Sequence, residues 1–169
     1  IANMEVGAAP ADFKFALTGQ GSPGKRTVVN DETSFAGRVI EQSRADRTDY
    51  RFPLAIFEPV VAKNIDVSVR FKPIAGRVDQ AGGIAVRVLD GDNYYVVRAN
   101  ALEENVVLYK VENGKRADLD PKGSGAAAYG KNGRIVGAVT FNHGKWLPYY
   151  AELIERSAPF PPPPPGYDR

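Results

Sequence analysis

Hydrophobic and polar residues alternate most clearly in residues 82–101, which read GGIAVRVLDGDNYYVVRANA. Side chains on a strand point alternately to its two faces, so this alternation predicts two strands. The Gly-Asp pair at residues 91–92 is typical of a tight hairpin turn between apolar runs. The hairpin predicts two cross-strand pairs: Asp90 opposite Asn93, and Ala85 opposite Arg98.

The predicted hairpin has one apolar face and one polar face. The apolar face consists of Ile84, Val86, Val88, Tyr95, Val97 and Ala99. Burial of apolar surface contributes about 25 cal/mol per Å², so this face is expected to pack on another layer. The polar face consists of Arg87, Tyr94, Arg98 and Asn100. Guanidinium, phenol and amide groups offer directional hydrogen bonds and an aromatic surface, which makes this face a candidate binding site.

Shorter alternating runs predict further strands along the chain. They cover residues 13–17, 27–30, 38–42, 49–57, 65–74 and 105–112. Residues 31–37 are rich in turn formers and predict a hairpin between the second and third of these runs. Pro53 has no backbone N–H, so the fourth run is predicted to be an edge strand or to contain a bulge. In the fifth run, Ile65, Val67, Val69 and Phe71 alternate with Asp66, Ser68, Arg70 and Lys72.

The pattern weakens after Leu119. Residues 134–141 and 146–154 are each consistent with a strand, and a short helix at 149–156 stays open as an alternative. Five consecutive prolines near the end predict a polyproline II segment, because proline fixes φ and cannot donate to a sheet. We therefore predict one β-sandwich domain at residues 1–158 and a proline-rich tail at 159–169.

Composition narrows the class of protein. A chain of 169 residues with 43% hydrophobic and 25% charged residues is typical of one globular domain. A net charge of +2 without clusters of like charge argues against a nucleic-acid partner. The absence of cysteine excludes disulfides and thiolate metal sites, and the absence of a long apolar run predicts no membrane insertion.

Three segments resemble bacterial domains of the concanavalin A-like lectin/glucanase superfamily. They are RVDQAGGIAVRVLDGDNYYVVRANALEENVVLYKVENGK, ADRTDYRFPLAIF and IDVSVRFKPIAG. The most similar members are laminin-G-like or family 16 glycoside hydrolase-like domains. The resemblance covers about residues 13–119. It implies an all-β, antiparallel two-sheet jelly roll whose concave sheet presents polar and aromatic residues to saccharides. It also implies an exported protein, periplasmic or secreted.

The chain departs from the glucanase branch of that superfamily. The branch carries an E-x-D-x-E or E-x-D-x-x-E run on one strand, and no such spacing occurs here. The branch's catalytic residues therefore have no counterpart in this chain. We predict a carbohydrate-binding domain without catalysis. The alternatives are a glycoside hydrolase that uses loop carboxylates such as Glu103 and Glu104, and an exported structural domain without a small ligand.

The polar face and the loops around it supply the candidate binding residues. The predicted ligand contacts are Arg70, Arg87, Tyr94, Arg98 and Asn100, with Asp79, Gln80, Glu103 and Tyr109 at the rim. Guanidinium and carboxamide groups suit hydroxyl pairs, carboxylates and sulfates. A second interpretation stays open, in which the arginines pair with nearby carboxylates and the tyrosines pack with their hydroxyls at an edge.

A metal or other cofactor is not predicted. Asp90 and Asp92 in LDGDN resemble the spaced oxygens of a calcium loop, but the further ligands and the bidentate glutamate of an EF-type loop are missing. Turn chemistry accounts for both aspartates, and calcium stays open as the weaker alternative. His143 is the only histidine, which excludes a histidine-rich metal site.

Overall fold

The protein is built from strands joined by turns and loops. The computed structural model describes residues 1–62, 67–103, 105–119 and 137–141, which form strands and no helix. The strands are β1 (Phe13–Gly19), β2 (Arg26–Asn30), β3 (Arg38–Gln42), β4 (Arg51–Phe57), β5 (Val67–Phe71), β6 (Ala81–Asp90), β7 (Asn93–Asn100), β8 (Asn105–Glu112), β9 (Lys115–Asp118) and β10 (Gly137–Phe141). The all-β prediction is confirmed.

Every described strand pairing is antiparallel. Strands β6, β7, β8 and β9 form one sheet in that order, and three two-stranded pairs accompany it: β1 with β4, β2 with β3, and β5 with β10. The turn between β8 and β9 is formed by Asn113 and Gly114, whose φ angles are 51° and 72°. Positive φ at both central residues is what a type I′ hairpin turn requires, and Asn-Gly is its preferred sequence.

One face of the four-stranded sheet holds an aliphatic core. Its members on β6, β7 and β8 are Ile84, Val86, Tyr95, Val97, Ala99 and Val106, and β5 packs on them through Val67, Val69 and Phe71. The ring of Phe71 lies so close to Gly82 that a Cβ atom there would be 2.7 Å from Cδ2 of the ring. Glycine at this position therefore gives β5 its close approach to the sheet.

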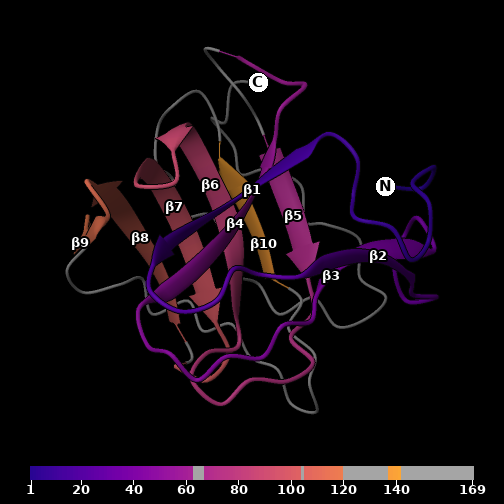
Figure 1. Cartoon of the computed structure of the whole chain (residues 1–169), viewed down its shortest axis with the longest axis horizontal. Coiled ribbons are helices and arrows are strands. Elements are labelled where there is room, and N and C mark those ends of the chain that lie inside the picture. Colours follow the sequence, from indigo (N-terminus) through magenta and orange to yellow (C-terminus); the bar gives the residue numbers. More distant parts are fainter. Residues whose placement is uncertain (63–66, 104, 120–136, 142–169) are drawn as a thin grey trace, which may run out of the picture.

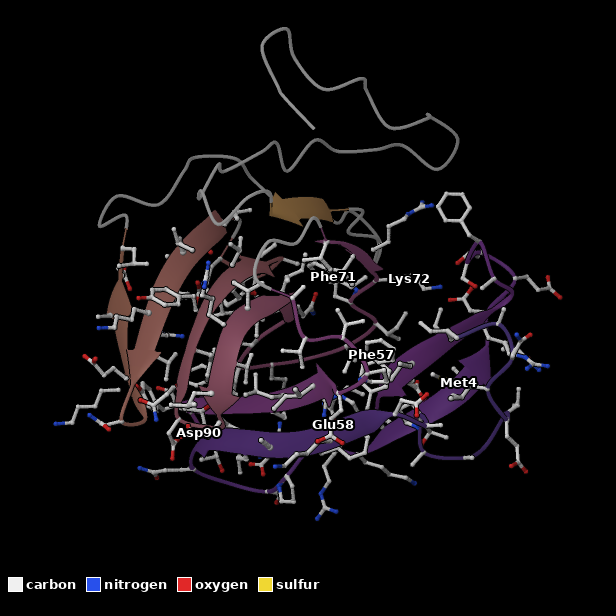
Figure 2. All side chains as sticks on the ribbon, turned by 90° about the horizontal axis from the view of Figure 1, so that it is seen from above. Met4, Phe57, Glu58, Phe71, Lys72 and Asp90 are labelled. Atoms are coloured by element: carbon white, nitrogen blue, oxygen red, sulfur yellow. The ribbon has the colours of Figure 1, made fainter. Side chains whose placement is uncertain are left out.

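The four-stranded sheet is covered on both faces. In Figure 1, β1 and β4 cross in front of the four-stranded sheet. Figure 2, seen from above, shows β1 and β4 along one side of that sheet and β10 along the other. Phe71, on β5, lies on the side away from β1 and β4, whereas Asp90 at the turn after β6 lies beside them (Figure 2). This arrangement is consistent with a β-sandwich.

The register of the central hairpin differs from the prediction in one respect. Asp90 lies opposite Asn93 as predicted, but Ala85 lies opposite Val96 rather than Arg98. A bulge causes the shift, because three residues of β6 from Arg87 to Leu89 oppose a single residue of β7. A shift of two residues preserves the face of every side chain before the bulge, so the aliphatic face was still predicted correctly. Val88 is the exception, because it was predicted on the aliphatic face but lies inside the bulge.

The remaining strand predictions agree closely with the structure. The predicted hairpin around residues 31–37 is the β2–β3 pair. Pro53 lies opposite Leu17 in the β1–β4 pair, which has only two strands, so β4 is an edge strand as predicted. β9 was not predicted. Residues 134–141 contain β10, whereas the predicted elements at 146–156 and the tail at 159–169 lie outside the described residues.

Candidate functional site

The second face of the four-stranded sheet, here called the Arg98 face, carries Tyr94, Arg98 and Asn100 of the predicted polar face. Antiparallel pairing places four cross-strand pairs on it: Tyr94 with Val111, Val96 with Tyr109, Arg98 with Val107, and Asn100 with Asn105. Pairing of β8 with β9 adds Arg116, which lies opposite Val111. Arg98, Asn100 and Asn105 lie toward one end of this face, and Tyr94, Val96, Tyr109 and Val111 lie toward the other end together with Arg116.

The apolar end of the Arg98 face is closed by β1 and β4. The hydroxyl of Tyr94 lies 2.8 Å from Oγ1 of Thr18, and the Thr18 hydroxyl donates to the carbonyl of Gly91 over 2.5 Å. Thr18 is fully buried and Tyr94 is only 3% exposed. Burial raises the pKa of Tyr94. The prediction that Tyr94 lies on an accessible face is therefore wrong, and its ring packs between two layers.

Asn100 is also a structural residue. It is completely buried, and its Oδ1 accepts hydrogen bonds from the backbone N–H groups of Gln80 and Leu102. Its Nδ2 donates to Oδ1 of Asp79 over 2.5 Å. The bonds to Gln80 and Asp79 tie the loop before β6 to the end of β7, and the bond from Leu102 holds the loop that follows β7. Asn100 was predicted as a ligand contact, but it has no exposed surface and instead positions Asp79.

Arg98 is the centre of the polar end. Its Nη2 donates to Oε2 of Glu103 and, over 3.0 Å, to Oδ1 of Asn105, while its Nη1 lies 3.8 Å from Oδ1 of Asp79. Asn105 Nδ2 also donates to Glu103 Oε2 over 3.1 Å. The Arg98 side chain is only 11% exposed, whereas those of Asp79 and Glu103 are 36% and 47% exposed. We call Arg98, Asp79, Glu103 and Asn105 the Arg98 cluster.

The electrostatics of the Arg98 cluster favour the charged form of Glu103. The hydrogen bond from Arg98, followed by its charge, lowers the pKa of Glu103 against the opposing effect of burial. Glu103 uses only its Oε2 and Asp79 only its Oδ1 in contacts with the described residues. One oxygen of each exposed carboxylate is therefore left to accept a hydrogen bond from outside. Arg98 Nε is buried and has no hydrogen-bond partner among the described residues.

Tyr109, predicted at the rim, lies beneath two arginines. It is 4% exposed, and its ring centroid lies 5.5 Å from Cζ of Arg98 and 4.3 Å from Cζ of Arg116. Burial raises the pKa of Tyr109, while the two positive charges oppose that rise. Tyr109 therefore cannot stack on a ligand itself. Its ring packs against both guanidinium groups.

Two other predicted contacts lie elsewhere. Arg70 projects from β5 on the side opposite to the core residues Val69 and Phe71, and its guanidinium lies 4.3 Å from the ring centroid of Phe35. Arg87 is exposed within the bulge and has a φ of 53°. Neither has a described contact with the Arg98 cluster. The predicted constellation is thus divided: Arg98, Asp79 and Glu103 form a compact group that the buried Asn100 and Tyr109 contact, and Arg70 and Arg87 lie apart from it.

Gln80 and the LDGDN turn have structural roles. The side chain of Gln80 donates to the carbonyl of Gly76 over 3.3 Å. Asp90 Oδ1 accepts from the backbone N–H of Asp92 over 2.8 Å and from the Asn93 side chain over 2.9 Å. The backbone bond is the main reason for the lowered pKa of Asp90. Within the described residues, no group of three or more histidines, aspartates or glutamates is placed to hold a metal ion.

Two residues of the Arg98 face, Asn105 and Arg116, were not predicted as site residues, although the sequence pattern contained a signal for each. Asn105 begins β8, and a short loop after Asn100 brings it opposite that residue. Arg116 lies two residues after the Asn113-Gly114 turn, whose type fixes the register of the strand that follows. If the alternation had been followed from the central hairpin into the next two strands, Asn105 and Arg116 would both have been placed on the Arg98 face.

Comparison with known proteins identifies no relative. The chain matches no family model, and it matches neither the curated proteins nor the solved structures with which it was compared. The resemblance to concanavalin A-like domains therefore stays a prediction. In the part of the chain that the structure describes, no helix is long and apolar enough to cross a membrane.

Proposed function

We propose that the protein is an exported, non-catalytic saccharide-binding β-sandwich of jelly-roll type, and that the Arg98 cluster is its binding site. The observation that supports this proposal is that the nearly buried guanidinium of Arg98 pairs with the partly exposed carboxylate of Asp79 and the exposed carboxylate of Glu103. Each carboxylate has one oxygen that no described residue contacts. Sugar hydroxyls donate and accept hydrogen bonds in fixed directions, so they need acceptors and donors held in place. The Arg98 cluster offers such acceptors.

Preorganisation supports this function. Arg98 is fixed by Glu103 and Asn105, and Asp79 is fixed by the buried Asn100. A ligand that binds the cluster therefore does not have to order these side chains, which would otherwise cost about 0.5–1.5 kcal/mol for each immobilised side chain. The aliphatic core behind the sheet holds the strands that carry them.

The same geometry disfavours the hydrolase alternative. A glycosidase needs one carboxyl with a raised pKa as its general acid. Arg98 has the opposite effect on Glu103, because it lowers the pKa of that carboxyl. Glu103 and Asp79 are also engaged by the same guanidinium. They are therefore suited to accepting hydrogen bonds from hydroxyls.

A glycan array tests the proposal directly. Wild-type protein is expected to bind a limited set of glycans. The Glu103→Gln and Asp79→Asn variants are expected to bind them about 10-fold or more weakly, because hydrogen bonds to charged groups contribute about 1.5–3 kcal/mol. Arg87→Gln removes an exposed arginine outside the cluster and serves as the control. Thermal melting of each variant verifies that the fold is kept.

Two results would contradict the proposal. One is binding that Arg87→Gln weakens as much as Glu103→Gln does, because the site would then lie elsewhere or the effect would come from net charge. The other is release of reducing sugar from glycosides that Glu103→Gln abolishes. In that case the carboxylates would be catalytic.

A further inference from the structure

Arg116 lies beside the Arg98 cluster and has a different environment. Its guanidinium is within 6 Å of three aromatic rings: Cζ lies 4.3 Å from the ring centroid of Tyr109, 4.7 Å from that of Phe52 and 5.8 Å from that of Tyr50. The rings of Tyr50 and Phe52 meet edge to face, with centroids 4.9 Å apart and an interplanar angle of 73°. We call Arg116 with these three rings the Arg116 cage.

The backbone of Arg116 is held as firmly as its side chain. The hydroxyl of Tyr50 accepts from the backbone N–H of Arg116 over 2.7 Å and donates to the carbonyl of Gly114 over 3.1 Å. Tyr50 itself has a φ of 52°, a conformation that residues other than glycine seldom adopt. Backbone strain of this kind is maintained only where surrounding contacts determine it. The turn before β9 and the start of β4 therefore position Arg116 together.

The donors of the Arg116 guanidinium are left unused by the described residues. Its side chain makes no hydrogen bond with them and has no carboxylate among them within 4.0 Å, although it is partly exposed. Contact with the rings uses none of the five N–H donors of the guanidinium, which are arranged as a planar fork. This is the geometry that receives a carboxylate or a sulfate through two parallel hydrogen bonds.

We infer that Arg116 binds an acidic group of the ligand, so that the site selects saccharides that carry a carboxylate or a sulfate. The inference rests on the proposed saccharide function. Arg98 and Arg116 contact the same Tyr109 ring, so one ligand can reach both. Its hydroxyls bind the free oxygens of Asp79 and Glu103, and its acidic group binds Arg116. The two exposed carboxylates repel an acidic group from the Arg98 side, which fixes the direction in which the ligand binds.

Matched ligands and variants test this inference. The ligands are oligosaccharides of uronic acids and the same oligosaccharides as methyl esters, in which the carboxylate charge is replaced by a neutral methyl ester. Arg116→Gln is expected to weaken binding of the acidic form at least 10-fold and to change binding of the ester less than 2-fold. Arg116→Lys keeps the charge but loses the planar fork, so it should recover only part of the affinity. Lys115→Gln removes the neighbouring positive charge of β9 and should leave both affinities unchanged.

Binding of small anions separates the two proposals. In arginine-selective NMR, titration with sodium acetate or sodium sulfate should shift the Nε–H signal of Arg116 saturably. The signal of Arg98, which already pairs with carboxylates, should move little. Equal affinity for acids and esters, with no shift of Arg116, would overturn the inference and leave the saccharide function standing. A saturable shift of Arg116 without binding of any glycan would instead contradict the saccharide function and show an anion site alone.

Discussion

The buried hydroxyl pair between β1 and β7 gives the sharpest test of how the Arg98 face is closed. The Thr18 hydroxyl donates its single proton to the Gly91 carbonyl, so the Tyr94 hydroxyl must donate to Thr18 Oγ1. Tyr94→Phe removes this donor and leaves no buried donor unpaired. The expected loss in free energy of unfolding is about 1 kcal/mol, the usual net value of one hydrogen bond.

Thr18→Val should cost more. It leaves the Tyr94 hydroxyl without a hydrogen-bond acceptor and removes the donor to the Gly91 carbonyl. An unsatisfied buried polar group costs about 1–3 kcal/mol. In the double variant the Tyr94 hydroxyl is absent, so it cannot be left without a hydrogen-bond partner. The combined loss should therefore be smaller than the sum of the two single losses by about 0.5–1 kcal/mol, a coupling typical of residues in contact.

Urea denaturation of the four proteins measures these values, with the slope of each transition showing whether the unfolding stays two-state. For a chain of this size each 1 kcal/mol should also lower the melting temperature by about 2–4 °C. If Tyr94 were an exposed platform, Tyr94→Phe would change stability by less than about 0.5 kcal/mol and show no coupling. That outcome would refute the closure of the Arg98 face by β1.

Two further predictions concern the core and an acidic loop. Val86→Ala should lower the free energy of unfolding by about 1–3 kcal/mol through lost burial. Arg87→Ala, in the exposed bulge, should change it by less than about 0.5 kcal/mol. Equal losses in urea denaturation would make Arg87 a structural residue. Asp31 has a pKa lowered to about 2, first by its hydrogen bond from Lys72, so its contribution to stability should be complete above about pH 5 and be lost as the pH falls through about 2. Carboxyl-carbon NMR should show that Lys72→Ala raises this pKa, and an unchanged midpoint would contradict the ion pair.

Much of the fold could be predicted because the strands alternate cleanly. Ile84, Val86 and Val97 were assigned to the core from period 2 alone, and the structure confirms them. The two-residue turn at residues 91–92 located the central hairpin, and its predicted pair of Asp90 with Asn93 is confirmed. Local patterns of this kind depend on a strand and its neighbour, and both are visible in the sequence.

The candidate site was harder to predict because its two determinants, a bulge and a contact with a distant strand, leave no mark on the alternation of β6 and β7. The bulge at Arg87 adds residues to one strand only, and nothing in the alternation of β6 indicates it. The burial of Tyr94 depends on Thr18, which lies 76 residues earlier in the chain. A polar sheet face looks the same in sequence whether it faces solvent or a second layer with matching hydroxyls. Only the tertiary arrangement shows that Tyr94 and Asn100 are structural and that Arg98 holds the exposed carboxylates.

Mapping a bound glycan onto the protein tests the central proposal most directly. Amide and arginine side-chain NMR signals would be followed while the glycan bound most tightly on the array is added. The account predicts saturable shifts that are largest at Arg98, Glu103 and Asn105. Shifts confined to Arg70 and the loop that carries Phe35, or the absence of saturable shifts with every glycan, would contradict the assignment of the Arg98 cluster as a saccharide site.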